Sequence, residues 1–125
     1  MKIHTFEIRA KLPSLNEVIG ANRTNRYMGA KFKRDIEDLI GMEIRQAQTV
    51  GTLEPVKNPC IIRITWNEST KKRDVDNIQS SQKCICDSLV KCGIVKDDSR
   101  RYVKQIYHQI EDAEKDSVLV TIEED

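Results

Sequence analysis

Residues 60–66 read CIIRITW, and this stretch decides the fold class. In an extended chain its side chains separate into two sets, Ile62, Ile64 and Trp66 on one side and Ile61, Arg63 and Thr65 on the other. β-Branched and aromatic residues in such a run are typical of a β-strand. We therefore expect a strand in the middle of the chain.

Helical patterns flank this strand on both sides. Before it, apolar residues recur at helical spacing over about residues 30–49, and Gly51 and Pro55 end that pattern. After it, a second helix is predicted over residues 77–92. Gly93 follows at the position where a left-handed residue commonly ends a helix.

Further strands are predicted towards the two ends of the chain, over residues 2–10, 102–110 and 118–122. Residues 111–117 would join the last two strands as a hairpin. The order β-α-β-α-β-β indicates an α+β fold. We expect a single small domain over residues 1–125, in which a mixed sheet of about four strands, with a C-terminal hairpin, packs with two helices.

Composition and charge limit the classes of function that the chain can have. The 125 residues carry a formal net charge of +1, so overall charge does not announce a nucleic-acid-binding protein. Positive charge is nevertheless concentrated in two segments, residues 1–35 and 71–101, which have an excess of Lys and Arg. The fold could bring these two segments together into one positive surface. The chain contains neither an apolar run of transmembrane length nor a signal-peptide core, so we expect a cytoplasmic protein without a membrane partner.

The stretch from Arg73 to Asn77, RDVDN, contains two carboxylates two residues apart. If this segment is extended, Asp74 and Asp76 point to the same face, where a hard cation between them would relieve their repulsion. The pair Asp97-Asp98, which follows the second helical region, could supply a third carboxylate. An EF-hand loop starting at Asp74 is excluded, because the glycine and glutamate that it requires are missing.

Two further groups of charges have a plain interpretation and a functional one. Lys83 and Asp87 share a helix face, either as an ordinary surface ion pair or as part of a cleft. Lys31, Lys33 and Arg34 lie in the first turns of a helix, the end that favours anions. They form either a solvated face or a site that awaits an external anion.

The combined pattern resembles the RusA family of Holliday-junction resolvases. The resemblance rests on RDVDN at 73–77, Lys83 and Asp87 in a helix, the motif that ends in Asp97-Asp98-Ser99, and the early stretch LPSLN at 12–16. The family implies a small homodimeric, Mg²⁺-dependent endonuclease, with Mn²⁺ as a substitute. Such an enzyme nicks four-way DNA junctions symmetrically during recombination and repair.

The resemblance also implies roles for individual residues. Asp74, Asp76 and Asp98 would bind the metal and take part in catalysis, with Asp98 favoured over Asp97. Lys83 would be the catalytic lysine, although its interval from Asp76 is longer than in the best-known enterobacterial form. The supporting residues would be Asn16, Asp87 and Asp97. The cations expected to contact DNA are Arg23, Arg26, Lys31, Lys33, Arg34, Lys71, Lys72 and Arg73.

Two alternatives stay open at the level of sequence. One is a non-catalytic relative that binds branched DNA, which a cleavage assay distinguishes. The other is a metal-dependent nucleotide or sugar-nucleotide transferase that shares only the Asp-x-Asp pattern. Mg²⁺-dependent release of a nucleoside diphosphate would favour it.

Overall fold

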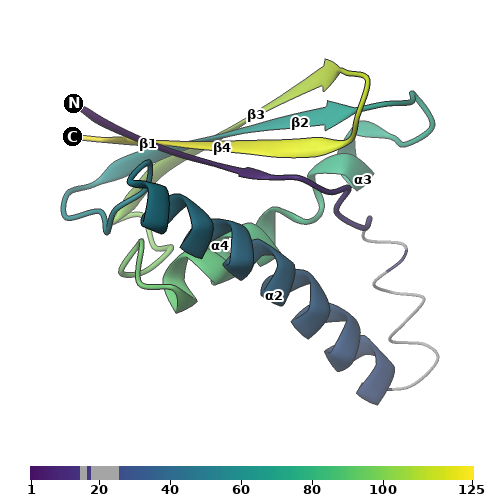
Figure 1. Cartoon of the computed structure of the whole chain (residues 1–125), viewed down its shortest axis with the longest axis horizontal. Coiled ribbons are helices and arrows are strands. Elements are labelled where there is room, and N and C mark those ends of the chain that lie inside the picture. Colours follow the sequence, from purple (N-terminus) through teal and green to yellow (C-terminus); the bar gives the residue numbers. More distant parts are fainter. Residues whose placement is uncertain (15–16, 18–25) are drawn as a thin grey trace.

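The computed structural model describes residues 1–14, 17 and 26–125. Its elements are β1 (Lys2–Ile8), α2 (Arg26–Val50), β2 (Cys60–Glu68), α3 (Val75–Gln79), α4 (Gln82–Lys91), β3 (Val103–Asp112) and β4 (Ser117–Glu124). The sheet forms one layer and the helices lie on one of its faces (Figure 1). The α+β class, the four-stranded mixed sheet and the element order are confirmed. In the described part of the chain no helix is long and apolar enough to cross a membrane.

The sheet order is β1-β4-β2-β3, and this overturns the predicted C-terminal hairpin. β4 is antiparallel to both β1 and β2, whereas β3 runs parallel to β2 and does not pair with β4. Only a short connection separates β3 from β4 in the sequence, which normally favours a hairpin. Burial explains the outcome. Val118, Val120 and Ile122 of β4 are almost completely buried, which suits an inner strand, whereas the side chains of β3 are mostly exposed or half-buried.

The hydrophobic core fills the space between the sheet and the helices. Alternate residues of the strands point into it, including Phe6 and Ile8 of β1 and Ile62, Ile64 and Trp66 of β2. α2 contributes Ile36, Ile40 and Ile44, and α4 contributes Ile85 and Leu89. The apolar stripe predicted from helical spacing is thus the buried face of α2, although the helix begins earlier than expected.

The second predicted helix is interrupted between α3 and α4. Ser81 lies at the break, and its hydroxyl donates a hydrogen bond to the carbonyl of Pro13. Ser81 is buried, so this bond satisfies a polar group that would otherwise lie unpaired in the core. The interruption reorients the chain, and the N-terminal segment at Pro13 is thereby fixed next to the start of α4.

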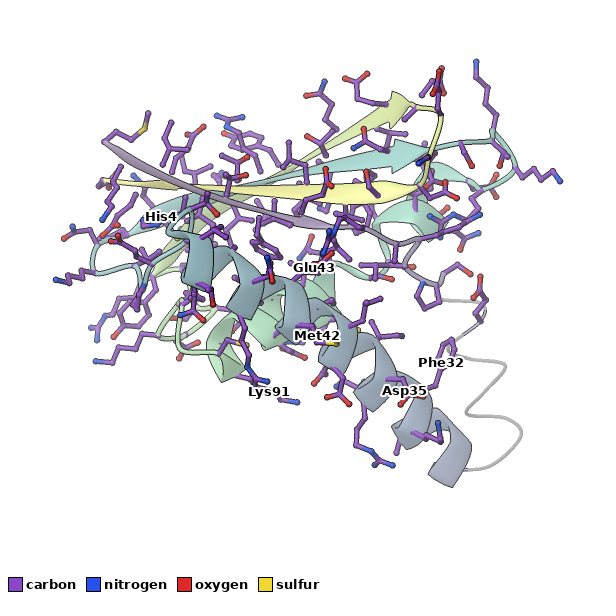
Figure 2. All side chains as sticks on the ribbon, viewed as in Figure 1. His4, Phe32, Asp35, Met42, Glu43 and Lys91 are labelled. Atoms are coloured by element: carbon purple, nitrogen blue, oxygen red, sulfur yellow. The ribbon has the colours of Figure 1, made fainter. Side chains whose placement is uncertain are left out.

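Two buried glutamates bind the N-terminal strand and the segment that follows it. Glu43 points from α2 towards the sheet (Figure 2) and accepts hydrogen bonds from the backbone N–H and the guanidinium of Arg9. Glu124, the last residue of β4, accepts from Nε2 of His4 at 2.9 Å. It also accepts from the backbone N–H groups of Lys57 and Asn58 at 2.8 and 3.0 Å. Each of the two carboxylates therefore accepts several hydrogen bonds, and these bonds fix β1 and the residue that follows it to α2 and β4.

Candidate active site

The segment that leads into the acidic pair is held by a nearly buried ion pair. Arg73 donates from Nε to Oε1 of Glu68 at 3.0 Å and from Nη2 to Oε2 at 2.6 Å. Its Nη1 donates to the carbonyl of Leu12 at 2.8 Å. Only 11% of the Arg73 side chain and 6% of that of Glu68 are exposed. That Arg73 contacts DNA stays a prediction; in the structure its guanidinium anchors the segment before Asp74.

The two carboxylates of the acidic pair lie in different backbone conformations. Asp74 is extended, with φ −71° and ψ 155°, and precedes α3 without capping it through its side chain. Asp76 lies in the first turn of α3, where its Oδ1 accepts the backbone N–H of Asn77 at 3.0 Å. Both residues are exposed. The prediction that Asp74 and Asp76 point to the same face required an extended segment. Only Asp74 is extended, because α3 starts between the two residues.

Lys83 lies between two carboxylates. Its Nζ is 3.2 Å from Oδ1 of Asp87, one turn further along α4, and 3.2 Å from Oδ2 of Asp98. The hydrogen bonds that Lys83 donates, first to Asp87 and then to Asp98, raise the pKa of Lys83, and the bond to Asp98 lowers the pKa of that carboxyl. The ammonium and the Asp98 carboxylate therefore both stay charged at neutral pH. The predicted helix-face pair of Lys83 and Asp87 is thus present and extended by Asp98.

The chain after α4 returns Asp98 to the helix. Gly93 has φ 74°, a conformation that side chains rarely adopt, and the backbone N–H groups of Ile94 and Val95 donate back to the carbonyl of Leu89. Ile94 and Val95 are buried, which holds this turn against the core. Asp97 is engaged locally, since its Oδ1 accepts the N–H of Ser99 at 3.0 Å.

The carboxylates predicted to bind metal do not form a closed cage. Among the described residues no group of three or more His, Cys, Asp or Glu side chains lies close enough together to hold a metal ion. Asp98 is brought together with Lys83 and Asp87. The donor chemistry of exposed carboxylates still suits Mg²⁺, which commonly takes one or two protein carboxylates and completes its shell with water and substrate phosphate.

The cations of α2 connect to the same cluster. Nζ of Lys33 is 3.8 Å from Oε1 of Glu37 and 3.8 Å from Oδ2 of Asp87. Lys91 of α4 also contacts Glu37, whose side chain is only 8% exposed. A row of alternating charges therefore runs from Lys91 through α2 to Lys83. Glu37 and Lys91 were not identified from the sequence, although the four-residue spacing of Lys33 and Glu37 is a signal that could have found the first of them.

The remaining predicted DNA contacts are exposed or outside the described residues. Arg34 and Lys72 are exposed, Lys31 pairs with Asp35 at 2.8 Å, and Lys71 lies 3.7 Å from Asp112. Asn16 and Arg23 lie outside the described residues, as does the side chain of Arg26.

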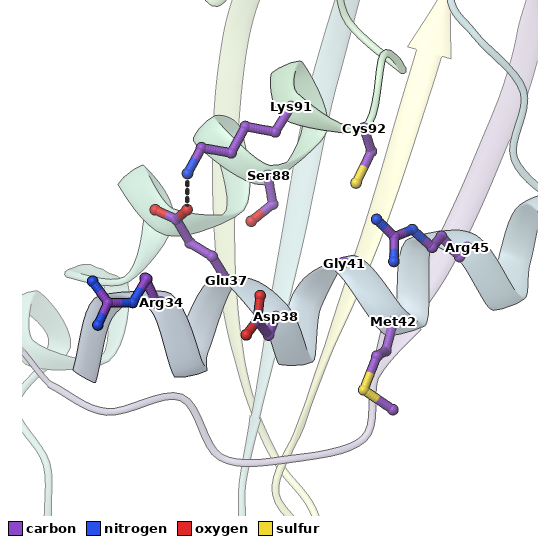
Figure 3. Close-up of a pocket in the computed structure, with 9 residues that line it drawn as sticks. All are labelled: Arg34, Glu37, Asp38, Gly41, Met42, Arg45, Ser88, Lys91 and Cys92. Carbon is purple, nitrogen blue, oxygen red and sulfur yellow. Dashed lines mark hydrogen bonds and ion pairs between the residues drawn. The ribbon is translucent and has the colours of Figure 1, made fainter. Parts of the chain in front are cut away.

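A hollow of about 490 Å³ lies beside this cluster, between α2 and α4 (Figure 3). Its lining includes Arg34, Arg45 and the Glu37–Lys91 pair, which Figure 3 shows across the gap between the helices. Asp74, Asp76 and Asp98 do not line it. The hollow is therefore lined by side chains of both charges and is separate from the predicted metal ligands.

The comparison with known families confirms the resemblance that the sequence suggested. The family model described as endodeoxyribonuclease RusA matches residues 12–123. No curated protein matches the chain. Because the matched region runs from the anchored LPS segment through the acidic pair, the Lys83 cluster and β4, this chain belongs to the RusA endodeoxyribonuclease family.

Proposed function

We propose that this protein is a Mg²⁺-dependent endonuclease that resolves four-way DNA junctions by paired, symmetric nicks in recombination and repair. The observation that carries the proposal is the family match over residues 12–123, since the RusA family implies Holliday-junction resolvase activity. The protein would act as a homodimer, because cutting two opposed strands requires two sites related by a two-fold axis.

Asp74, Asp76 and Asp98 would hold the ion. A bound Mg²⁺ supplies an activated water and neutralises charge on the scissile phosphate. The exposed position of Asp74 and Asp76 supports this assignment, because substrate phosphate can approach them without displacing core residues. Asp87 and Asp97 would support the site from α4 and from the loop after it.

Lys83 would stabilise the negative charge that develops on the phosphate. It must leave the carboxylate of Asp98 before either group can act on substrate. Because 69% of the Lys83 side chain and 42% of that of Asp98 are exposed, separating them costs little. Asp87 stays within reach of the ammonium and would keep it near the phosphate while Asp98 is engaged elsewhere.

The exposed cations would position the DNA by contacts to its phosphates. Lys33 lies close to Asp87, the residue that also pairs with Lys83. Arg34 and Lys72 are exposed to solvent. Such contacts supply affinity that depends on salt, and they do not read sequence.

The test is incubation of the protein with a synthetic four-way junction and with a linear duplex of matched sequence, in Mg²⁺ or in chelator. We expect paired nicks in the junction only, in Mg²⁺ only, with ends that a ligase can seal. Mn²⁺ should replace Mg²⁺. Junction binding without nicking in either metal would instead identify a non-catalytic relative, and equal cutting of the duplex would contradict structure specificity.

A further inference from the structure

A chain of hydrogen bonds leads from the core of the protein to the start of α4. It begins at Trp66 of β2, which is almost completely buried. The Nε1–H of Trp66 donates to Nδ1 of His108, in the middle of β3, at 2.9 Å. The two rings lie nearly parallel, with their centroids 6.0 Å apart. Because an indole nitrogen can only donate, Nδ1 of His108 must accept and carries no proton.

The other nitrogen of His108 fixes the direction of a glutamine. Burial lowers the pKa of His108, so the ring is neutral at pH 7 and carries its one proton on Nε2. Nε2 lies 2.7 Å from Oε1 of Gln82, the first residue of α4, and donates its proton to that oxygen. Both residues are half-buried. The oxygen of the Gln82 amide is thus held towards β3.

The NH2 group of the same amide is directed away from His108 and is open to solvent. In the described part of the chain no acceptor is found for this group. It is not buried either, because Oε1 of Glu37 is the single buried side-chain nitrogen or oxygen there that lacks a hydrogen-bond partner. A donor that is held in one direction and has no protein partner is suited to an acceptor on a bound molecule.

Gln82 lies beside the residues predicted to act on the phosphate. It directly precedes Lys83, whose Nζ is 3.2 Å from Oδ2 of Asp98. Asp98 in turn lines a narrow crevice together with Val103, the first residue of β3. Consecutive residues of a helix point about 100° apart, so the two side chains leave the same end of α4 in neighbouring directions. Gln82 reaches the middle of β3, and Lys83 reaches the residue beside its start.

We propose that Gln82 is a further substrate-binding residue of this site, and that its amide N–H donates to a phosphate oxygen of the DNA strand next to Lys83. His108 is the positioning residue that holds the amide in this direction. The inference rests on the proposed function, since the acceptor is present only if DNA is the substrate. Glutamine amides are common donors to DNA phosphates, and such contacts fix the register of the protein on the nucleic acid.

The hydrogen bond from His108 prepares this contact before DNA arrives. A free glutamine side chain has several rotatable bonds, and ordering it on binding costs entropy. Here the rigid ring of His108, itself held by Trp66, has already restricted the amide. The amide is neutral, so it adds a directed hydrogen bond beside the Lys83 ammonium without adding charge.

The first test is Gln82→Ala in the full-length chain, measured by fluorescence anisotropy of a labelled four-way junction in chelator. We expect the dissociation constant to rise roughly three- to tenfold, because one hydrogen bond to a phosphate is lost. The slope of log binding constant against log salt should stay as in wild type, since a neutral donor releases no counterion. Gln105→Ala removes an exposed glutamine from the open face of the sheet and should bind like wild type.

The second test asks whether His108 acts through Gln82. His108→Phe keeps the ring and removes both nitrogens, so the dissociation constant should rise roughly two- to fivefold. Added to Gln82→Ala, the same change should have no further effect, because the amide that it positions is gone. His108→Gln again offers one acceptor and one donor and should bind within about twofold of wild type. It serves as the second variant if circular dichroism shows that His108→Phe is not folded.

Three outcomes would overturn the inference. Wild-type affinity of Gln82→Ala would remove the contact, and a lower salt slope would show that cations had been displaced instead. Equal losses from His108→Phe in the two backgrounds would assign His108 to the fold alone. Binding and nicking of the junction by the wild-type chain are measured separately. If wild type binds and nicks while Gln82→Ala binds equally well, this inference fails and the proposed function stands, whereas a wild-type chain that does not bind the junction would contradict both.

Discussion

Glu124 and Asp98 are both carboxylates that pair with a nitrogen base, and their surroundings are opposite. Glu124 is 5% exposed and accepts hydrogen bonds from His4 and from two backbone N–H groups. The side chain of Asp98 is 42% exposed and is paired with Lys83, which is 69% exposed. A buried carboxylate with a full set of donors holds elements of the fold together. An exposed carboxylate beside a long, flexible lysine adds little stability and stays available for chemistry.

The largest effect should come from removing charge at the acidic pair. Asp76→Asn should lower the single-turnover rate of junction cleavage by about 10²–10³-fold, the size seen when one charge-stabilising group is lost. Because Asp76 is exposed, the melting temperature should not change, and junction binding in chelator should persist. Asp38→Asn, the same change at an exposed position of α2, is the control. A wild-type cleavage rate for Asp76→Asn would remove this residue from the mechanism.

Loss of the lysine should have the next largest effect. Lys83→Ala should reduce the single-turnover rate by roughly 10–10²-fold, because the developing charge on the phosphate loses one cation. Lys91→Ala removes an equally exposed lysine from the last turn of the same helix, and we expect nearly wild-type cleavage from it. Equal losses in the two variants would show that the general charge of α4 matters and that the position of Lys83 does not.

Glu124→Gln should separate stability from activity in the opposite direction. The amide cannot satisfy all the donors that converge on this carboxylate, so the free energy of unfolding should fall by about 2 kcal/mol. Urea denaturation measures this loss. Glu123→Gln, next to it and paired with Arg63, should cost less because that pair is more exposed. The cleavage rate per folded molecule should be unchanged, and a large loss of rate would break the contrast between Glu124 and Asp98.

The pH dependence of stability tests the same site without a second substitution. Hydrogen bonding from His4 and from the backbone of Lys57 and Asn58 lowers the pKa of Glu124 to about 2. In the unfolded chain a glutamate has a pKa of about 4.3, so between these values the unfolded state binds more protons. The advantage of wild type over Glu124→Gln should therefore be complete above about pH 5 and disappear as pH falls towards 2. A difference that does not vary with pH would contradict the lowered pKa.

The smallest effect concerns two neighbouring cations. Lys72 is exposed, whereas Arg73 is held by Glu68 and the carbonyl of Leu12. Lys72→Ala should reduce the slope of log binding constant against log salt by about 1, because the variant neutralises one phosphate fewer. Lys57→Ala, at an exposed lysine outside the predicted DNA-binding set, should leave the slope unchanged. Fluorescence anisotropy of a labelled junction at several salt concentrations measures the slope, and an unaltered slope for Lys72→Ala would exclude that interaction.

Local patterns predicted most of the elements and part of the candidate site. The alternation in residues 60–66 and the apolar stripe of α2 are visible in the sequence because side-chain direction repeats every two residues in a strand and every 3.6 in a helix. The pairing of Lys83 with Asp87 follows from the same helical period. The break at Ser81 was not predicted, since it depends on a hydrogen bond to Pro13, which is distant in the sequence.

The sequence by itself determined the element order, the buried faces of the helices and strands, and the family, because each depends on residue types at short or fixed spacing. Only the tertiary structure decided that β2 separates β3 from β4, that Arg73 is an anchor and that Asp98 lies against Lys83. These features depend on which distant segments compete for the same partner. The pairing of a strand at both of its edges, and the burial of a guanidinium beside a carboxylate, are properties of the assembled chain. Neither produces a repeating pattern in the local sequence.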